Sequence, residues 1–232
     1  KKKMNRKYPE DFINKIINGD CLEVIKEIPD KSVDLVLTDP PYLIGAKGCG
    51  LAGDRQYLHE ITDKNLDKGF DFSVLEELQR ILKSINIIIF SGRLQLKDYI
   101  DWIYKNNYNW NLICWHKNDP TPLTNNNYLP DTEYVFHIWE NRKLTGSYET
   151  KKKFYILPRE EKFNHPTTKP IQLIGNLIQN ASDESDLILD PFIGSGTTAV
   201  AAKQLKRNFI GIEISPEYCK IAEDRLRQNI LV

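Results

Sequence analysis

The sequence has few cysteines, and they are not spaced as metal ligands. Its four cysteines, Cys21, Cys49, Cys114 and Cys219, are scattered, and so are its four histidines. No two cysteines are separated by the two residues that are typical of zinc sites. We therefore expect no bound metal, and cysteines that remain reduced in a cytoplasmic protein.

The chain also lacks a long hydrophobic run and an excess of charge of either sign. No segment approaches the roughly 20 apolar residues that a membrane span needs, so no membrane contact is expected. Lysine and arginine together number 32, as do aspartate and glutamate, which gives a formal net charge of zero. This balance does not by itself indicate nucleic-acid binding. It does not exclude it either, because binding to phosphates needs a basic face and not a basic average.

The sequence does contain a regular alternation of short apolar segments and helical patterns. Four apolar segments each end in an acidic residue, namely Asp20, Asp39, Asp190 and Glu213. Continuous apolar runs of this kind are typical of strands buried on both faces of a parallel sheet. Three of these segments lead into helical patterns, which cover Cys21–Ile28, Thr197–Leu205 and Pro216–Gln228.

The middle of the chain continues the alternation. The pattern predicts helices over Phe72–Leu82 and Leu94–Lys105, with a strand over Ile85–Phe90 between them. Two further strands, Trp110–Trp115 and Glu133–Trp139, are expected as antiparallel neighbours at the sheet edge. These elements indicate an α/β fold with a doubly wound, mostly parallel twisted sheet and an antiparallel edge. Ligands of such sheets bind beyond the carboxyl ends of the strands, where the four acids would gather.

Neither an internal repeat nor a low-complexity linker divides the chain, so we expect residues 1–232 to form a single domain. Two stretches within it do not follow a regular pattern. Residues 43–69 are rich in glycine and polar side chains and are expected to form a mobile loop. Residues 121–164 are the candidate region for contacts to a polymeric substrate.

The segment DPFIGSGTTAVAA, from Asp190 to Ala202, combines a strand end, a glycine turn and a helix start. Gly194 and Gly196 permit a tight turn, and the helix start offers N–H groups to a carboxylate or phosphate. A triphosphate-binding loop would need a lysine after the last glycine, and none follows Gly196. A dinucleotide loop remains an alternative, although Asp190 would repel a pyrophosphate. S-adenosylmethionine fits better, because its two cationic groups suit carboxylates and its own carboxylate suits the helix start.

The second motif is the turn Asp39-Pro40-Pro41-Tyr42, which directly follows a predicted strand. An exocyclic base amine is a poor nucleophile, because its lone pair is delocalised into the ring. The Asp39 carboxylate and the Pro40 carbonyl could accept its two hydrogens and expose that lone pair. The prolines fix φ, and Tyr42 offers a face on which a base rotated out of the duplex can stack. No cysteine has the context that covalent methylation of a pyrimidine carbon would need.

Five segments in this order resemble the amino-group DNA methyltransferases of the permuted β class. The segments are DPPY at Asp39–Tyr42, WHKNDPTP at Trp115–Pro122, HPTTKP at His165–Pro170, DPFIGSGTT at Asp190–Thr198 and FIGIE at Phe209–Glu213. The match extends from about Asn18 to Arg227. It implies a Rossmann-like methyltransferase fold, DNA as partner, a place in restriction–modification, and transfer from S-adenosylmethionine to N6 of adenine by direct displacement after base flipping.

The resemblance also implies roles for individual residues. The catalytic set would be Asp39, Pro40, Pro41 and Tyr42. The cofactor would be surrounded by Asp20, the backbone of Cys21, Asp39, His165, Lys169, Asp190, Phe192, Gly194, Ser195, Gly196, Thr197 and Glu213. In this family Asp39 favours adenine, because cytosine enzymes usually have serine there.

Three alternatives stay open from the sequence: a cytosine-N4 DNA methyltransferase, an NAD-dependent oxidoreductase, and a silent DNA-binding subunit. The short 121–164 region further implies a short recognition sequence, a homodimer or a second methyltransferase subunit.

Overall fold

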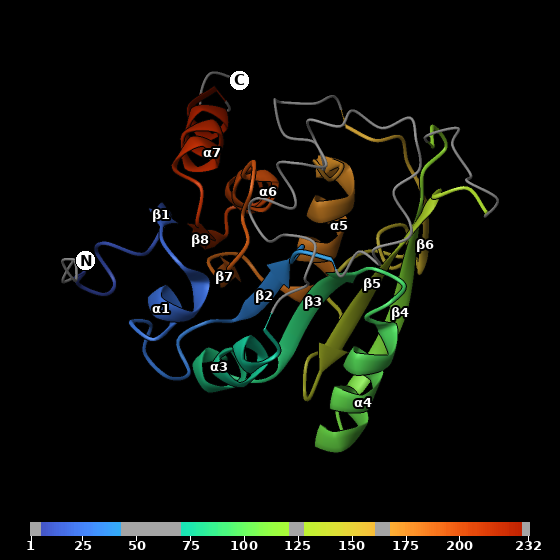
Figure 1. Cartoon of the computed structure of the whole chain (residues 1–232), viewed down its shortest axis with the longest axis horizontal. Coiled ribbons are helices and arrows are strands. Elements are labelled where there is room, and N and C mark those ends of the chain that lie inside the picture. Colours follow the sequence, from blue (N-terminus) through green and yellow to red (C-terminus); the bar gives the residue numbers. More distant parts are fainter. Residues whose placement is uncertain (1–5, 43–70, 121–127, 161–167, 229–232) are drawn as a thin grey trace.

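The computed structural model describes residues 6–42, 71–120, 128–160 and 168–228. Eight strands form one sheet in the order β1-β8-β7-β2-β3-β5-β4-β6 (Figure 1). The strands are β1 (Lys15–Asn18), β2 (Leu35–Thr38), β3 (Asn86–Ser91), β4 (Asn109–His116), β5 (Thr132–Trp139), β6 (Phe154–Ile156), β7 (Leu187–Asp190) and β8 (Asn208–Glu213). The helices are α1 (Cys21–Ile25), α3 (Ser73–Ile81), α4 (Leu96–Asn106), α5 (Ile171–Ala181), α6 (Thr197–Gln204) and α7 (Pro216–Gln228).

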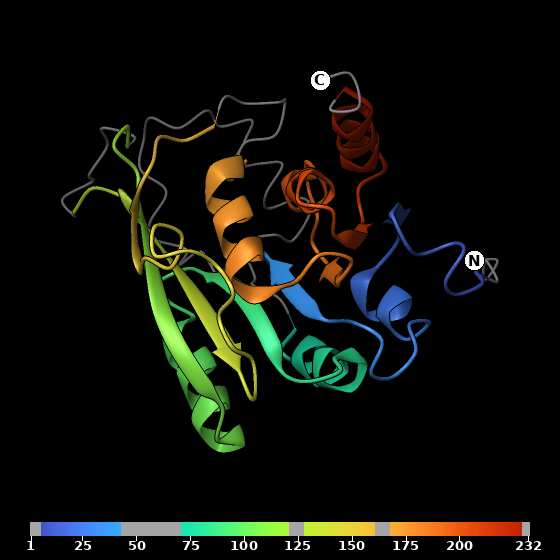
Figure 2. The ribbon, with the colours of Figure 1, turned by 180° about the vertical axis from the view of Figure 1, so that it is seen from behind.

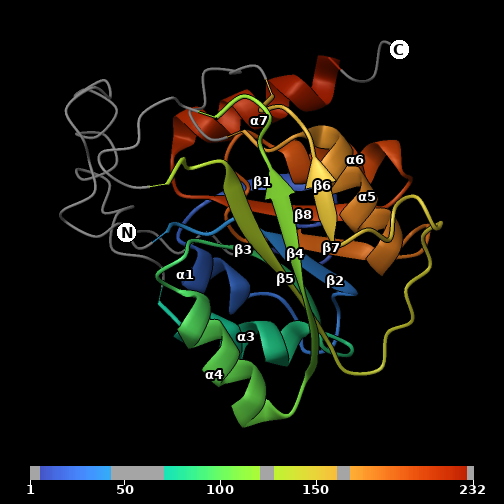
Figure 3. The ribbon, with the colours of Figure 1, turned by 90° about the vertical axis from the view of Figure 1, so that its right-hand side faces the viewer.

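The predicted doubly wound sheet is confirmed. The strands β1, β8, β7, β2 and β3 are parallel, and β5 runs antiparallel between β3 and β4. The expected antiparallel pair of β4 and β5 is also present on that side of the sheet, and β6 adds one short parallel strand beyond β4 (Figure 3). β6 lies inside the 121–164 stretch, which was expected to be irregular. A strand of three residues carries too little pattern to identify, and its pairing with β4 defines it.

Helices cover both faces of the sheet (Figures 1 and 2). One buried cluster joins the sheet to α1, α3 and α4, and a second joins it to α5 and α6, with Leu226 of α7 packed against it. Successive side chains of a strand point to opposite faces, so Val36 of β2 belongs to the first cluster and Leu35 and Leu37 belong to the second. Burial on both faces explains why the central strands are continuously apolar.

α6 packs between α5 and α7. Its residues from Thr197 to Ala202 are all buried, which is why it shows little amphipathic pattern. α7 begins with Pro216 in the first turn, as predicted, and ends at Gln228. None of the helices within the described ranges is long and apolar enough to cross a membrane.

The chain leaves β2 and β7 in opposite directions along the sheet. After β2 it continues through α3 to β3, on one side, and after β7 it continues through α6 to β8, on the other. The topological switch point therefore lies between β2 and β7, which pair directly. In open α/β sheets the ligand-binding crevice lies at the carboxyl ends of such strands.

Candidate functional site

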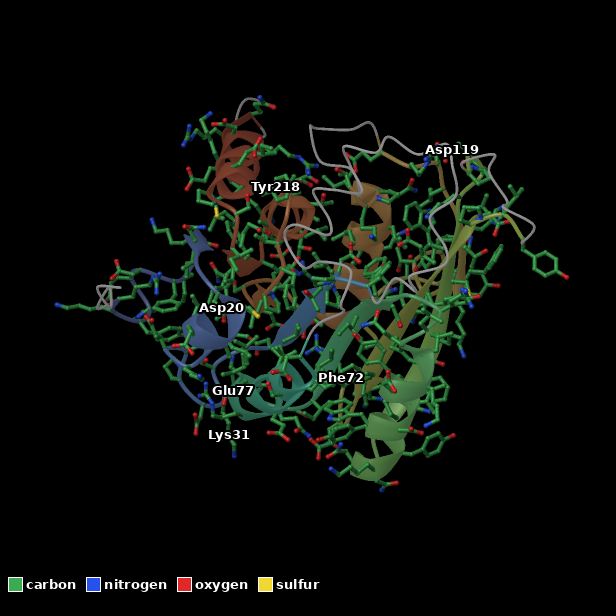
Figure 4. All side chains as sticks on the ribbon, viewed as in Figure 1. Asp20, Lys31, Phe72, Glu77, Asp119 and Tyr218 are labelled. Carbon is green, nitrogen blue, oxygen red and sulfur yellow. The ribbon has the colours of Figure 1, made fainter. Side chains whose placement is uncertain are left out.

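The four acidic residues lie together at the carboxyl ends of the parallel strands. Glu213 ends β8 and Asp190 ends β7, while Asp39 follows β2 directly and Asp20 follows β1 by two residues. Figure 4 shows Asp20 at the start of α1, and Asp119, which follows β4, far from it on the other side of the molecule. Parallel pairing thus brings together residues that are far apart in the chain.

Asp190 joins the two strands at the switch point. Its Oδ1 accepts hydrogen bonds from the Thr38 hydroxyl, at 2.8 Å, and from the Phe192 N–H, at 3.1 Å. Thr38 and Asp190 are both buried. Burial raises the pKa of Asp190 to about 7, although hydrogen bonds from the Thr198 and Thr38 hydroxyls act in the opposite direction. Sequence reasoning missed Thr38, whose position one residue before Asp39 was the available signal.

Glu213 connects the glycine loop to the end of β8. Its Oε2 accepts a hydrogen bond from the Gly194 N–H at 3.1 Å, and its Oε1 accepts one from the Ser215 N–H at 2.8 Å. The loop turns through left-handed conformations at Gly194 (φ 50°) and Gly196 (φ 87°), which are the positions where glycine was expected.

Arg225 of α7 holds the loop from the opposite side, and it was not identified from the sequence. Its Nη1 donates to the carbonyl oxygen of Ser195 at 2.9 Å, and to Ser195 Oγ and Thr197 Oγ1 at 3.0 Å each. Burial lowers the pKa of Arg225. The sequence signal for its burial was the helical spacing, because Arg225 continues the series of buried residues Cys219 and Ala222 at intervals of three.

The buried Lys169 and the partly buried Asp39 form an ion pair at the other end of the site. The Lys169 ammonium bonds to Asp39 Oδ2 and lies 3.2 Å from Glu133 Oε2. It also lies 5.1 Å from the centre of the Phe90 ring and 5.6 Å from that of Tyr42. Asp39 Oδ1 is buried and has no hydrogen-bond partner within the described part of the chain. Lys169 thus contacts the DPPY turn, while its neighbour Thr168 approaches Ser195 of the glycine loop, with 3.5 Å between the hydroxyls.

Glu133 was not expected in the site. Its Oε1 lies 2.7 Å from the Lys117 ammonium, and its Oε2 accepts a hydrogen bond from the Tyr42 hydroxyl at 3.2 Å. Burial alone would raise the pKa of Glu133, but the charges of Lys169 and Lys117 outweigh it and lower the pKa to about 2. Glu133 was recognised only as the start of a strand. Because β5 is antiparallel, its first residues lie at the carboxyl ends of its parallel neighbours, where Ser91 of β3 faces Tyr134.

The remaining residues of the expected cofactor set lie nearby or outside the described residues. Asp20 caps α1, since its Oδ1 accepts the Glu23 N–H at 3.3 Å. Cys21 begins that helix, and burial, together with the adjacent Asp20 carboxylate, raises the pKa of its thiol to about 12. Pro40 and Pro41 follow Asp39 without regular secondary structure. His165, Cys49 and the 43–69 loop lie outside the described residues.

These groups fit a small ligand that carries both cationic groups and a carboxylate. Carboxylates line the edge, the start of α6 offers N–H groups, and the acceptor Asp39 Oδ1 faces the site without a donor among the described residues. Within those residues, no group of three His, Cys, Asp or Glu side chains is arranged to hold a metal ion.

The sequence matches the DNA methylase family over residues 33–224. It is 34% identical over 251 residues to the Type II methyltransferase M.HinfI of Haemophilus influenzae, which covers 94% of this chain and 69% of that protein. It is 29% identical over 254 residues to the Type II methyltransferase M2.LlaDCHI of Lactococcus lactis subsp. cremoris, which covers 97% of this chain and 94% of that protein.

Solved structures give the same result. The structure of an M1.HpyAVI–SAM complex superposes with a TM-score of 0.64 at 30% identity, over 91% of this chain and 99% of that one. The cytosine-N4-specific PvuII DNA methyltransferase superposes with a TM-score of 0.69 at 19% identity, over 92% of this chain and 90% of that one, which is a likeness of fold.

The glycine turn predicts a test of the loop's packing. A Cβ at Gly196 would lie 2.8 Å from Ala222 Cβ and 2.9 Å from Ala222 Cα, at a φ of 87°. We expect Gly196→Ala to lower the free energy of unfolding by about 2 kcal/mol and to weaken cofactor binding. Gly175→Ala in α5 is the matched control, because a Cβ there would meet nothing within 4 Å. Denaturant titration and calorimetry measure both effects. Equal behaviour of the two variants would contradict the packing argument.

Asp190 predicts a pH dependence of stability. Its folded pKa of about 7 lies above the ordinary value of 3.8. The folded protein therefore keeps a proton that the unfolded chain loses, and this contribution to stability disappears as the pH rises from about 4 to 7. The loss is about 1.4 kcal/mol per pH unit at most.

Asp190→Asn removes this titration while keeping an acceptor for Thr38. We expect the ligand-free variant to be more stable than the wild type at pH 8, with the difference shrinking toward pH 4. Urea unfolding at several pH values measures the difference, and a gap independent of pH would refute the assignment.

Proposed function

The chain belongs to the DNA methylase family, and on that premise we propose that it methylates N6 of adenine in DNA. The amino-group DNA methyltransferase expected from the sequence is thereby confirmed, and the NAD-dependent oxidoreductase is wrong. S-adenosylmethionine is the methyl donor. When bound, it supplies an electrophilic methyl group on a cationic sulfur.

The observation that supports the proposal is the difference between the two carboxylate oxygens of Asp39. Its Oδ2 is occupied by Lys169, whereas its buried Oδ1 lacks a donor among the described residues. An unsatisfied buried acceptor is costly unless a ligand supplies a donor. An exocyclic amine would donate one hydrogen to Oδ1 and the other to the Pro40 carbonyl. Burial raises the pKa of Asp39, which favours uptake of the proton that the methylated nitrogen must lose.

We assign Tyr42 to the flipped base. A Cβ at Gly92, just after β3, would lie 3.3 Å from Tyr42 Cβ, so this glycine allows Tyr42 to lie close to the backbone. In the proposed reaction the amine lone pair forms the new N–C bond while the carbon–sulfur bond breaks toward sulfur, and the nitrogen then loses a proton. Positioning by Asp39, Pro40 and Tyr42 would supply much of the rate.

The cofactor roles expected from the sequence remain part of the proposal. The start of α6 and the loop of Gly194, Ser195 and Gly196 would hold the methionine portion, with Asp190 and Phe192 beside them. Glu213 would accept hydrogen bonds from the ribose hydroxyls, and Asp20 with Cys21 would bind the adenine of the cofactor. Lys169 is the exception, because its contacts support a role on the side of the target base.

We also propose a narrower DNA-recognition region within the single domain. Of residues 121–164, β5 and β6 belong to the sheet, and the segment 140–153 connects them. Tyr148 is exposed there, next to the exposed lysines of the 151–153 run. A basic and aromatic surface of this kind suits a nucleic acid. A homodimer or second subunit stays a prediction.

Replacing Asp39 tests the proposed catalytic role. We expect Asp39→Asn to lower methyl transfer to DNA by roughly 100-fold or more, while the dissociation constant for S-adenosylmethionine stays within a few-fold of the wild type. Radiolabelled methyl incorporation and calorimetry measure the two quantities. Asp101→Asn on the exposed face of α4 is the control. Wild-type turnover by Asp39→Asn would rule out this role.

The methylated base decides between adenine and cytosine. The Asp39 identity favours adenine, although the hydrogen bonds alone would suit cytosine N4 equally. DNA from a host that expresses the protein should contain N6-methyladenine at one short sequence, detected by modification-sensitive sequencing. N4-methylcytosine at that sequence would instead support the cytosine alternative.

A further inference from the structure

We propose that Glu133 is a positioning residue for methyl transfer, which holds the Asp39 carboxylate and the Tyr42 ring in one fixed arrangement through Lys169 and the Tyr42 hydroxyl. This inference rests on the proposed function, because it assigns Asp39 to the target amine and Tyr42 to the target base. Glu133 is assigned no contact with the target base, and it acts through Lys169 and Tyr42.

The sheet topology places Glu133 between these groups. It lies near the start of β5, where the antiparallel strand meets the end of β3 and faces Trp115 near the end of β4. Lys117, just beyond β4, bonds to Glu133 Oε1 at 2.7 Å and lies 5.3 Å from the centre of the Trp115 ring. Lys117 therefore holds Oε1 of Glu133, while Oε2 contacts Lys169 and Tyr42.

The first link runs through Lys169. Its ammonium bridges Glu133 Oε2 and Asp39 Oδ2, and only 7% of the side chain is exposed. A lysine has a flexible four-carbon stem and three rotatable donors, so one partner would not fix its direction. Two carboxylates, Asp39 just after β2 and Glu133 on β5, do fix the direction of the Lys169 side chain. Because the Lys169 ammonium is paired with Asp39 Oδ2, Oδ1 is the oxygen that is available to the amine.

The second link runs through Tyr42. Its hydroxyl donates to the same Glu133 Oε2 at 3.2 Å, and its ring lies beside the Lys169 ammonium. The acceptor for the amine and the face for the base are therefore set by one oxygen atom. Both are held relative to β5, although they belong to the turn after β2.

The cluster is also balanced in charge. Two carboxylates, Asp39 and Glu133, face two ammonium groups, Lys117 and Lys169. Removing one member of a buried ion cluster leaves an uncompensated charge, whereas the complete set is tolerated. Burial raises the pKa of Asp39, and the neighbouring Glu133 carboxylate raises it further. Loss of the Glu133 charge should therefore lower the pKa of Asp39, because the repulsion from Glu133 would be lost while burial and the attraction of Lys169 remain.

The test uses Glu133→Gln, with Glu140→Gln as the matched control, because Glu140 is exposed and directly follows the same strand. Substrate DNA carries the sequence found to be methylated in the host. We expect kcat of Glu133→Gln to fall roughly 100-fold, while its dissociation constant for S-adenosylmethionine, measured by calorimetry, stays that of the wild type. The acidic limb of its pH–kcat profile should move to lower pH by roughly one unit. Glu140→Gln should match the wild type throughout.

A double-mutant cycle with Lys169→Met asks whether Glu133 acts through Lys169. If it does, the loss of kcat in the double variant is smaller than the product of the two single losses, and what remains beyond Lys169→Met alone reflects the link through Tyr42. Should Glu133→Gln unfold, Tyr42→Phe tests the second link on its own, because it removes only the hydroxyl, and kcat should fall roughly 10-fold with cofactor binding unchanged.

Some results would overturn the inference while leaving the proposed function intact. They are an active wild type with an equally active Glu133→Gln, an unshifted pH profile, multiplicative losses in the cycle, or a fully active Tyr42→Phe. A wild type that does not methylate adenine, or an active Asp39→Asn, would instead count against the proposed function.

Discussion

The direct pairing of β2 with β7, reinforced by the hydrogen bond from Thr38 to Asp190, is the constraint on which the site depends. β2 leads into the turn that would accept the target amine, and β7 leads into the glycine loop that would hold the cofactor. The two are about 150 residues apart in the chain, and no local interaction could set their distance. Strand pairing sets it at one edge of the sheet, within a core that is too well packed to deform gradually. Arg225 from one side and Glu133 from the other then fix the two loops against this frame.

The sequence was sufficient for the strands around the switch point, because buried parallel strands have an unmistakable apolar pattern. It was also sufficient for α7, whose start is marked by Ser215 and Pro216. α5 also has a clear sequence signal, which is the amphipathic spacing of Leu173, Ile174, Leu177 and Ile178. β6 was beyond reach, since three residues carry no periodicity. Glu133 and Arg225 were missed for a different reason, because each is a charged residue in an ordinary strand or helix, and only the tertiary fold turns it toward the site.

The electrostatics of the site differ along the sheet edge. On the side of β1, β8 and β7, carboxylates predominate, which suits the cationic S-adenosylmethionine. On the side of β3, β5 and β4, carboxylates are paired with the ammonium groups of Lys117 and Lys169, which suits a neutral base whose amine needs an acceptor. Asp39 lies at the boundary between these two environments. The zero net charge of the chain therefore conceals a strongly patterned site, in agreement with the view that local distribution matters more than the average.

The switch point has one more consequence, which concerns the continuity of the backbone. The half of the chain before residue 140 contains the proposed amine-binding turn, and the half after residue 153 contains the glycine loop and Glu213, while Asp20 and Lys169 are each proposed to act with residues of the opposite half. The two halves meet through strand pairing and side-chain packing, while the covalent connection between them runs through the exposed segment 140–153. Breaks at exposed segments of this kind are the ones that folded domains tolerate best. The site is thus a property of how the halves associate, and two separate polypeptides that shared this interface would assemble the same chemistry.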